Sequence, residues 1–256
     1  MDPSTLIGAG LALTAIFGSV IMEGGNLGSM FLIPPMILVF GGTIGAAMAG
    51  ALLRDAKSLP KSLTKAITAK VSTPHDNVQQ IISLAERARR EGLLALEADI
   101  ANVEDPFLRR ALEMAVDGTD SDEVAEILGA EVDAKRSADA AEAKLFHDMG
   151  GYSPTIGIIG TVLGLVHVLG SLSDPASLGP KIASAFVATL WGVMAANIFW
   201  FPLANRLKRV SDTECEQMEL AIEGVLAIQA GSNPRLIARK LQSMLTTAEP
   251  PAKEVA

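Results

Sequence analysis

Four long apolar segments without a single Lys, Arg, Asp or Glu dominate the hydropathy pattern of the chain. They cover residues 5–22, 30–53, 154–172 and 182–203. A helix of about 20 apolar residues crosses the hydrocarbon core of a bilayer. The pattern therefore predicts an all-α polytopic membrane protein whose four transmembrane helices form two hairpins. The first segment lacks the basic flank and cleavage site of a signal peptide, so we expect it to remain in the mature protein.

The residues between the two hairpins, 54–151, follow the period of an amphipathic helix. Val78, Ile81 and Ala85 share one helix face, while Arg90 lies on the opposite, polar face. We therefore expect residues 54–151 to form a helical cytoplasmic domain.

Local signals mark helix ends in this domain. Proline in the first turn makes residues 105–106 a typical helix start, and Ser121 is a typical N-cap. The helix that begins at Ser121 is expected to run towards Met149, where Gly150 and Gly151 interrupt it.

The chain thus divides into four expected parts. They are a first transmembrane hairpin (1–53), a cytoplasmic helical domain (54–151), a second transmembrane hairpin (152–205) and cytoplasmic C-terminal helices with a tail (206–256). In the last part, a polar helix should end near Ala230, a second short helix should follow residues 231–234, and residues 249–256 are expected to be disordered.

The basic residues set the expected orientation in the membrane. Arg54, Lys57 and Lys61 follow the second span and Arg206 follows the fourth, whereas the turn 23–29 has no Lys or Arg. Basic flanks mark the cytoplasmic side of a membrane protein. Both short turns should therefore lie outside, and both termini should be cytoplasmic.

Composition argues against several classes of protein. A net charge of -8 and a pI near 5.0 speak against nucleic acid as a partner. The single cysteine, Cys215, excludes an internal disulfide and has no neighbours at metal-chelating spacing, so ordinary packing is its expected role. No phosphate-binding loop, nucleophile elbow or carboxylate pair is visible. We therefore expect neither an enzyme nor a metal or cofactor site.

A few polar or helix-breaking residues lie inside the expected spans. Pro154 and Pro202 sit at comparable depth on the cytoplasmic side. The missing N–H of each proline either marks a helix boundary or leaves a backbone carbonyl free to meet an ion. Thr161 and Thr189, on adjacent spans, either bond to their own backbone or line a polar path. His167 lies near the outer end of its span, and its role stays open.

The spans contain no side chain that could carry a charge through the membrane, apart from this histidine. Proton and sodium relays are normally built on carboxylates or other ionisable groups. If the chain conducts ions, a partner must therefore supply the titrating residue.

Two spans carry a long motif that resembles a known family. Residues 152–166 (YSPTIGIIGTVLGLV) are its densest part, and it continues through 172–175, 179–180, 188–192 and 201–205. In this motif the chain resembles the A subunit of the bacterial flagellar motor stator, the MotA/PomA family, and more distantly the ExbB/TolQ proteins. The cytoplasmic stretch 88–97 looks like the rotor-facing segment of the family.

This resemblance implies a function and partners. It implies five A subunits around two single-span B subunits of the MotB/PomB type in the bacterial inner membrane. An aspartate of the B subunit would carry H⁺ or Na⁺, which agrees with the missing carboxylate. The A ring would turn and push the rotor protein FliG, so the chain would be an ion-conducting, torque-generating subunit.

The resemblance also assigns roles to individual residues. It implies that Pro154 and Pro202 couple ion flow to movement and that Thr161 and Thr189 line the ion path. Arg89, Arg90 and Glu97 match the rotor-contacting charges, and Asp174 matches an acidic position in the outer turn, a candidate ion entrance. Thr161 is typical of sodium-driven members, but Ala188 stands where these often have a second threonine. The sequence therefore leaves the coupling ion open.

Other functions compete with the stator. An ExbB/TolQ-like energiser of outer-membrane processes would have three spans and an N-terminus outside. A purely structural membrane scaffold would use its prolines and threonines only to shape helices.

Overall fold

The computed structural model describes residues 4–69 and 74–245, and in these ranges it contains only helices and turns. The all-α fold class is therefore confirmed. The chain divides into two compact units. The spanning unit comprises residues 1–70 and 138–210, and the second unit comprises 71–137 and 211–256. The expected disordered tail, 249–256, lies outside the described residues.

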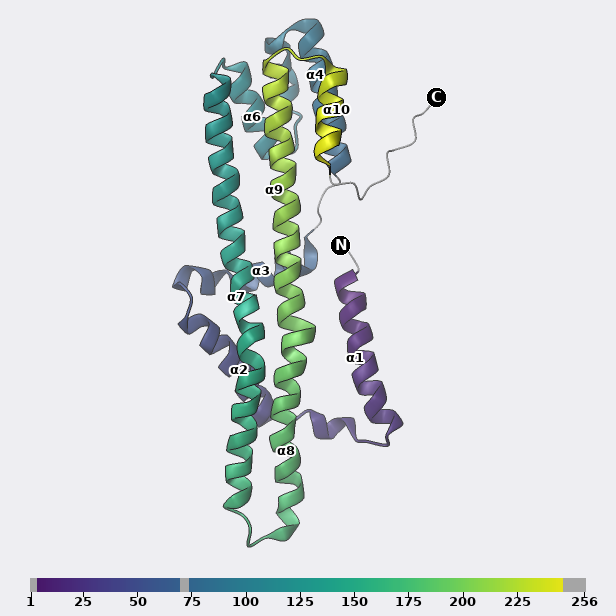
Figure 1. The fold of residues 1–256 in the computed structure, drawn as a ribbon, viewed down its shortest axis with the longest axis vertical. Coiled ribbons are helices and arrows are strands. Elements are labelled where there is room, and N and C mark those ends of the chain that lie inside the picture. The colour runs from purple at the N-terminus through teal and green to yellow at the C-terminus, as the bar shows by residue number, and fades with distance from the viewer. Residues whose placement is uncertain (1–3, 70–73, 246–256) are drawn as a thin grey trace. The chain divides into compact units, whose positions relative to one another are not determined.

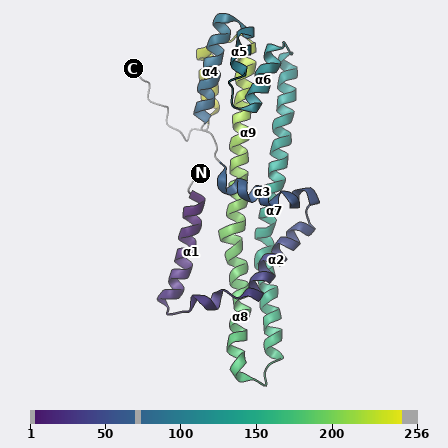
Figure 2. The same cartoon turned by 180° about the vertical axis from the view of Figure 1, so that it is seen from behind.

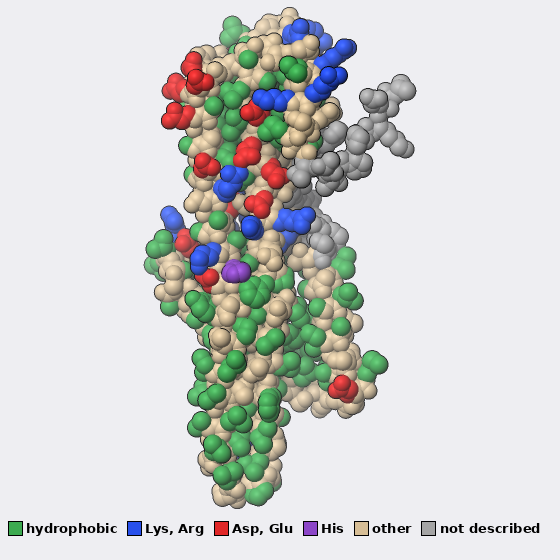
Figure 3. Space-filling model, viewed as in Figure 1, with side chains coloured by type: hydrophobic (Ala, Val, Ile, Leu, Met, Phe, Trp, Pro, Cys, Tyr) green, Lys and Arg blue, Asp and Glu red, His purple; other side chains and the backbone are tan. Residues whose placement is uncertain are grey.

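The spanning unit holds the apolar helices, and Figure 1 labels the helices along the chain. Its elements are α1 (Ser4–Met22), the 3₁₀ helix η1 (Leu27–Met30), α2 (Ile33–Ala49), α3 (Leu53–Thr68), the C-terminal part of α7 (Ser121–Leu169), α8 (Pro175–Met194), the π-helix η3 (Ala195–Trp200) and the start of α9 (Phe201–Gln229). On the face drawn in Figure 3, hydrophobic side chains cover α8 and the adjacent part of α7.

Among the residues that the structure describes, three helical stretches are long and apolar enough to cross a membrane: Thr5–Met22, Ser121–Leu169 and Pro175–Gln229. The fourth apolar helix, α2, has 17 residues and is shorter than the expected span 30–53. Two prolines in its first turn set its start, since proline fits the first positions of a helix. The apolar residues that precede α2 belong to the 3₁₀ helix and its turn.

The helix α7 runs through Gly150, Gly151 and Pro154 without ending. The expected interruption at Gly150 and Gly151 is therefore wrong. Glycine lowers helix stability by only about 1 kcal/mol per residue, which packing can offset. Gly150 is buried beneath the ring of Phe201, so tertiary contact overrides its low helix propensity.

A seam of glycines brings α7 and α8 together. A Cβ on Gly160 would lie 2.6 Å from the Cβ of Ala188, and one on Gly164 would lie 2.6 Å from that of Ala185. Such distances leave no room for a side chain, so the two backbones approach closely, as small residues allow in membranes.

The indole of Trp191 fixes the 3₁₀ helix to α8. Its Nε1 donates a hydrogen bond to the carbonyl oxygen of Met30 at 2.6 Å. The rings of Phe31 and Phe40 contact the same indole at centroid distances of 5.5 and 5.8 Å. A buried indole with its N–H satisfied is a strong anchor.

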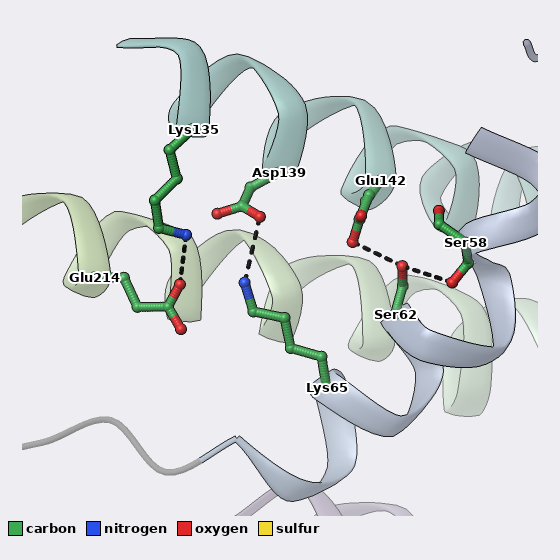
Figure 4. Close-up of polar contacts among 7 residues, drawn as sticks. All are labelled: Ser58, Ser62, Lys65, Lys135, Asp139, Glu142 and Glu214. Atoms are coloured by element: carbon green, nitrogen blue, oxygen red, sulfur yellow. Dashed lines mark hydrogen bonds and ion pairs between the residues drawn. The ribbon is translucent and has the colours of Figure 1, made fainter. Parts of the chain in front are cut away.

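Polar contacts hold α3 on α7 (Figure 4). The Ser62 hydroxyl donates to the carboxylate of Glu142 at 2.7 Å, and Lys65 Nζ lies 3.3 Å from Asp139 Oδ1. Ala56 and Ala66 are buried on the same side of α3. Both views show α3 crossing α7 rather than running along it (Figures 1 and 2).

The second unit has its own hydrophobic core. It is built from α4 (Pro74–Glu91), the 3₁₀ helix η2 (Leu93–Leu96), α5 (Glu97–Ile100), α6 (Pro106–Val116), the start of α7, the end of α9 and α10 (Pro234–Met244). Ile81, Leu112 and Leu128 are among its fully buried side chains, and Cys215 is also buried there. The packing role expected for Cys215 is confirmed.

The expected N-cap of α7 is wrong: Ser121 is the first residue of the helix, and the carboxylate of Asp120 caps it by accepting a hydrogen bond from the N–H of Asp122 at 2.9 Å. Two other helix boundaries in the second unit follow the expected signals. The carboxylate of Asp105 accepts a hydrogen bond from the N–H of Phe107 at 2.8 Å and caps α6. After α9 ends at Gln229, Gly231 adopts a φ of 66° and α10 begins at Pro234.

Ion pairs join α7 to α9 within the second unit. Lys135 Nζ lies 2.6 Å from Glu214 Oε2, and Arg136 Nη2 lies 2.6 Å from Glu219 Oε1. The hydrogen bond from Arg136 to the Glu219 carboxylate raises the pKa of the guanidinium further above its ordinary value. Both pairs are partly exposed to solvent, so each contributes little to the free energy of folding.

Candidate ion path and charged surface

Thr161 and Thr189 meet between α7 and α8. Their hydroxyls are in direct hydrogen-bond contact. Thr161 Oγ1 lies 3.0 Å from the carbonyl oxygen of Ala185, and both hydroxyls lie 3.3 Å from that of Gly157. The structure therefore brings together two hydroxyls and two carbonyl oxygens from neighbouring helices.

The glycine seam makes this cluster possible. A Cβ on Gly157 would lie 2.8 Å from the carbonyl oxygen of Ala188 and 3.1 Å from the Cα of Thr189. Without this close approach, the carbonyl oxygen of Gly157 could not reach the hydroxyl of Thr189 on the other helix. Neutral oxygens of this kind can replace the hydration oxygens of a cation.

The two prolines lie in different settings. Pro154 is inside α7, half-buried, and Pro202 is the second residue of α9, directly after the π-helix. Pro202 also lines a cavity of about 520 Å³ between α1 and the η3–α9 segment, together with Asn197 and Arg206.

Asp174 lies at the N-cap position of α8, in the turn that follows α7, and its side chain is exposed. Lys181 Nζ donates to the hydroxyl of Ser171 at 2.7 Å, which closes this turn. His167, near the end of α7, is also exposed.

The expected rotor-facing charges lie in the second unit. Arg89 and Arg90 are exposed at the end of α4, and Glu97 is exposed at the start of α5. Gly92, with a φ of 88°, turns the chain between them. The charges therefore share one exposed bend of the chain.

Sequence reasoning missed the residue that holds this bend. Arg87 Nη1 lies 2.5 Å from Asp99 Oδ1 and its Nε lies 3.2 Å from Glu91 Oε2, so it ties α4 to α5. Arg87, Arg90 and Asp99 line a cavity of about 330 Å³. The spacing of Arg87 from Asp99 gives no local signal, because the turn at Gly92 creates the pair.

A third exposed feature of the bend is apolar. Leu94 is 72% exposed, in the 3₁₀ helix between Arg90 and Glu97. A single exposed leucine is common on protein surfaces and does not by itself indicate an interface.

No group of three or more His, Cys, Asp or Glu side chains that could hold a metal ion occurs in residues 4–69 and 74–245. The polar centre between α7 and α8 is instead built from the neutral hydroxyl and carbonyl oxygens around Thr161 and Thr189.

The long apolar helices define a helical integral membrane protein. Residues 99–220 match the MotA/TolQ/ExbB proton channel family, and residues 6–92 match the Motility protein A N-terminal family. The chain belongs to the Motility protein A family and is an ion-conducting stator subunit of the bacterial flagellar motor.

Individual relatives match nearly the whole chain. Motility protein A of Bacillus subtilis is 36% identical over 255 residues, which cover 99% of this chain and 93% of that protein. The structure of C. jejuni MotAB contains a chain with a TM-score of 0.94 and 29% identity, covering 99% of this chain and 100% of that one. The flagellar MotAB stator complex from Bacillus subtilis gives a TM-score of 0.88 and 35% identity, covering 95% and 96%. Together with the apolar helices, this family membership makes the chain an inner-membrane protein.

Proposed function

We propose that this chain generates torque by coupling ion flow to rotation, in a complex with a MotB-like B subunit. The hydroxyl pair of Thr161 and Thr189 on the Gly157 carbonyl carries this proposal. It is a neutral oxygen cluster in spans that contain no Lys, Arg, Asp or Glu. A carboxylate from the partner would carry the ion past it, since a neutral cluster can coordinate an ion but cannot titrate.

In this proposal five copies of the chain surround the B subunits, with both termini of each copy in the cytoplasm. The basic residues that follow the second and fourth spans support this orientation. Asp174, exposed in the turn before α8, would lie outside and attract cations at the entrance.

The prolines and the charged bend complete the proposal. Pro154 and Pro202 would let α7 and the α8–α9 helix flex as the ion passes, because each removes a backbone hydrogen bond. The bend that carries Arg89, Arg90 and Glu97 would push the charged surface of the rotor protein FliG.

The test is the swimming speed of a stator-null strain that carries this chain and its cognate B subunit. Speed is recorded in sodium-free medium and across a sodium titration. Speed that rises from near zero with sodium would establish the motor as sodium-driven, with Thr161 on the sodium path. Sodium-independent swimming that a protonophore abolishes would establish it as proton-driven. A strain that does not swim in either medium, although both subunits reach the membrane, would refute the proposal.

A further inference from the structure

One residue touches both proline-disrupted sites of the spanning unit. Pro154 has no N–H, so the carbonyl of Gly150, four residues earlier, lacks its usual helical donor in α7. The ring of Phe201 lies directly on Gly150. A Cβ on Gly150 would lie 2.5 Å from Cε1, 2.6 Å from Cδ1 and 2.8 Å from Cζ of that ring. Only glycine fits beneath the ring at this place.

The backbone of Phe201 belongs to the other disrupted site. Its N–H donates to the carbonyl of Ala196, five residues earlier, which is the last bond of the π-helix. The next residue, Pro202, cannot donate at all. Phe201 therefore ends the π-turn before Pro202, while its side chain covers the glycine that precedes Pro154 by one turn.

A second ring holds the contact from the side. His147, one turn before Gly150 in α7, lies against Phe201 with a centroid distance of 5.2 Å and an interplanar angle of 59°. The Phe201 ring is thus held by two positions on the same face of α7.

We propose that Phe201 is a positioning residue that couples movement of α7 at Pro154 to movement of the α8–α9 helix at Pro202. The inference rests on the coupling role proposed above for the two prolines. A close-packed contact transmits displacement, because no gap remains to absorb it. Because Gly150 has no Cβ, the Phe201 ring lies flat against the backbone of α7. The ring therefore stays in contact with α7 as that helix bends. Single π-turns often mark functional sites in helices, which agrees with this place for a moving joint.

The first variant is Gly150→Ala, with Gly151→Ala as its matched control. The added methyl at position 150 must displace the Phe201 ring, whereas a Cβ at position 151 has nothing within 4 Å. Both variants add the same atom to adjacent helix positions. They differ only in whether they disturb the ring.

The measurement separates movement from ion flow. Swimming speed and ion influx, the latter from an indicator of cytoplasmic pH or sodium, are recorded in cells that contain the complex with its cognate B subunit. For Gly150→Ala we expect speed per unit of influx to fall about fivefold, the factor equivalent to ~1 kcal/mol. Gly151→Ala should match the wild type in both quantities.

A rescue tests whether the ring is responsible. Phe201→Leu should also lower speed per unit of influx, because it removes the contact without a clash. The double variant combines Gly150→Ala with Phe201→Leu. The smaller leucine side chain leaves room for the added methyl, so its speed per unit of influx should rise above that of Gly150→Ala alone. Phe201→Tyr, which keeps the ring, should behave like the wild type.

Three outcomes would overturn the inference. They are unchanged speed per unit of influx in Phe201→Leu, an equal effect of the two glycine variants, and a double variant no better than Gly150→Ala. If Gly150→Ala fails to reach the membrane, the speed per unit of influx of Phe201→Leu alone tests the inference. Failure of the coupling role proposed for the prolines looks different: Pro154→Ala would then swim normally, whatever the Phe201 variants do. Failure of the motor function itself would leave the wild-type complex unable to swim.

Discussion

At the scale of single residues, the hydroxyl of Thr189 lies at the centre of the polar cluster between α7 and α8. It contacts the hydroxyl of Thr161 and the carbonyl oxygen of Gly157, and both partners belong to the other helix. Removing this hydroxyl would therefore take one oxygen from the candidate ion path and leave the backbone of both helices unchanged.

Thr189→Ala makes this change. We expect ion influx to fall about fivefold, because losing one hydrogen-bonding oxygen costs on the order of 1 kcal/mol. Swimming speed and influx are the measurements. Thr189→Ser keeps the hydroxyl and serves as the control, and equal speeds for the Ala, Ser and wild-type proteins would remove Thr189 from the ion path.

The sequence predicted the two threonines but not their contact. Thr161 and Thr189 could be placed on adjacent spans from the apolar segments alone. Their direct contact could not be predicted, because it depends on the register between α7 and α8 and on the close approach at Gly157. The packing of Phe201 on Gly150 escaped prediction for the same reason, since a contact with a glycine leaves no local signal.

At the scale of elements, the sequence predicted helices well and their limits less well. Apolar length identified α1 and the hairpin of α7 and α8, and proline and aspartate marked the start of α6. The helix was expected to stop at Gly150, but packing carries α7 through it. The π-helix has no sequence signature beyond the proline that follows it, because it depends on a single shifted hydrogen bond.

The anchor of the 3₁₀ helix η1 gives a prediction for stability. Trp191→Phe keeps an aromatic ring but leaves the Met30 carbonyl without its donor. The free energy of unfolding should fall by about 1–3 kcal/mol, the usual cost of an unsatisfied buried polar group. Thermal unfolding of the purified protein in detergent measures this. An unchanged melting temperature would mean that water replaces the indole.

The contact between α3 and α7 offers a charge-reversal test. Lys65→Glu places two carboxylates opposite each other at partly buried positions, with side chains 27% and 16% exposed. The melting temperature should fall, by the equivalent of about 1 kcal/mol. Adding Asp139→Lys restores opposite charges, so the double variant should recover part of the loss. No recovery would show that other contacts of these side chains dominate.

At the scale of the whole molecule, charge is segregated between the spans and the remainder of the chain. The chain has 21 Lys and Arg and 29 Asp and Glu, and none of them lies in the four apolar segments. This segregation is why the class of membrane protein could be predicted from the sequence. The ion pair of Arg87 with Asp99 could not be predicted from the sequence, because the turn at Gly92 brings the two residues together.

The charged bend yields a prediction about the rotor. Arg89→Glu together with Arg90→Glu should reduce torque while the complex still assembles in the membrane, since both side chains are exposed. Binding of the purified stator complex to the rotor protein should weaken several-fold in this variant. Binding of the wild-type complex should weaken as the salt concentration rises, because exposed charges are screened over about 10 Å at 0.1 M. Loss of membrane assembly instead would assign these arginines to folding.

The burial of Cys215 means that the native chain has no accessible thiol, so cysteines introduced elsewhere can be labelled selectively. It is the only cysteine in the sequence, and it is fully enclosed in the core of the second unit. A membrane-impermeant maleimide added to intact cells should therefore leave the native chain unmodified. Single cysteines introduced at Asp174 and at Leu94, both exposed, would then report sidedness without background: reaction at 174 and none at 94 is the outcome that the proposed orientation requires.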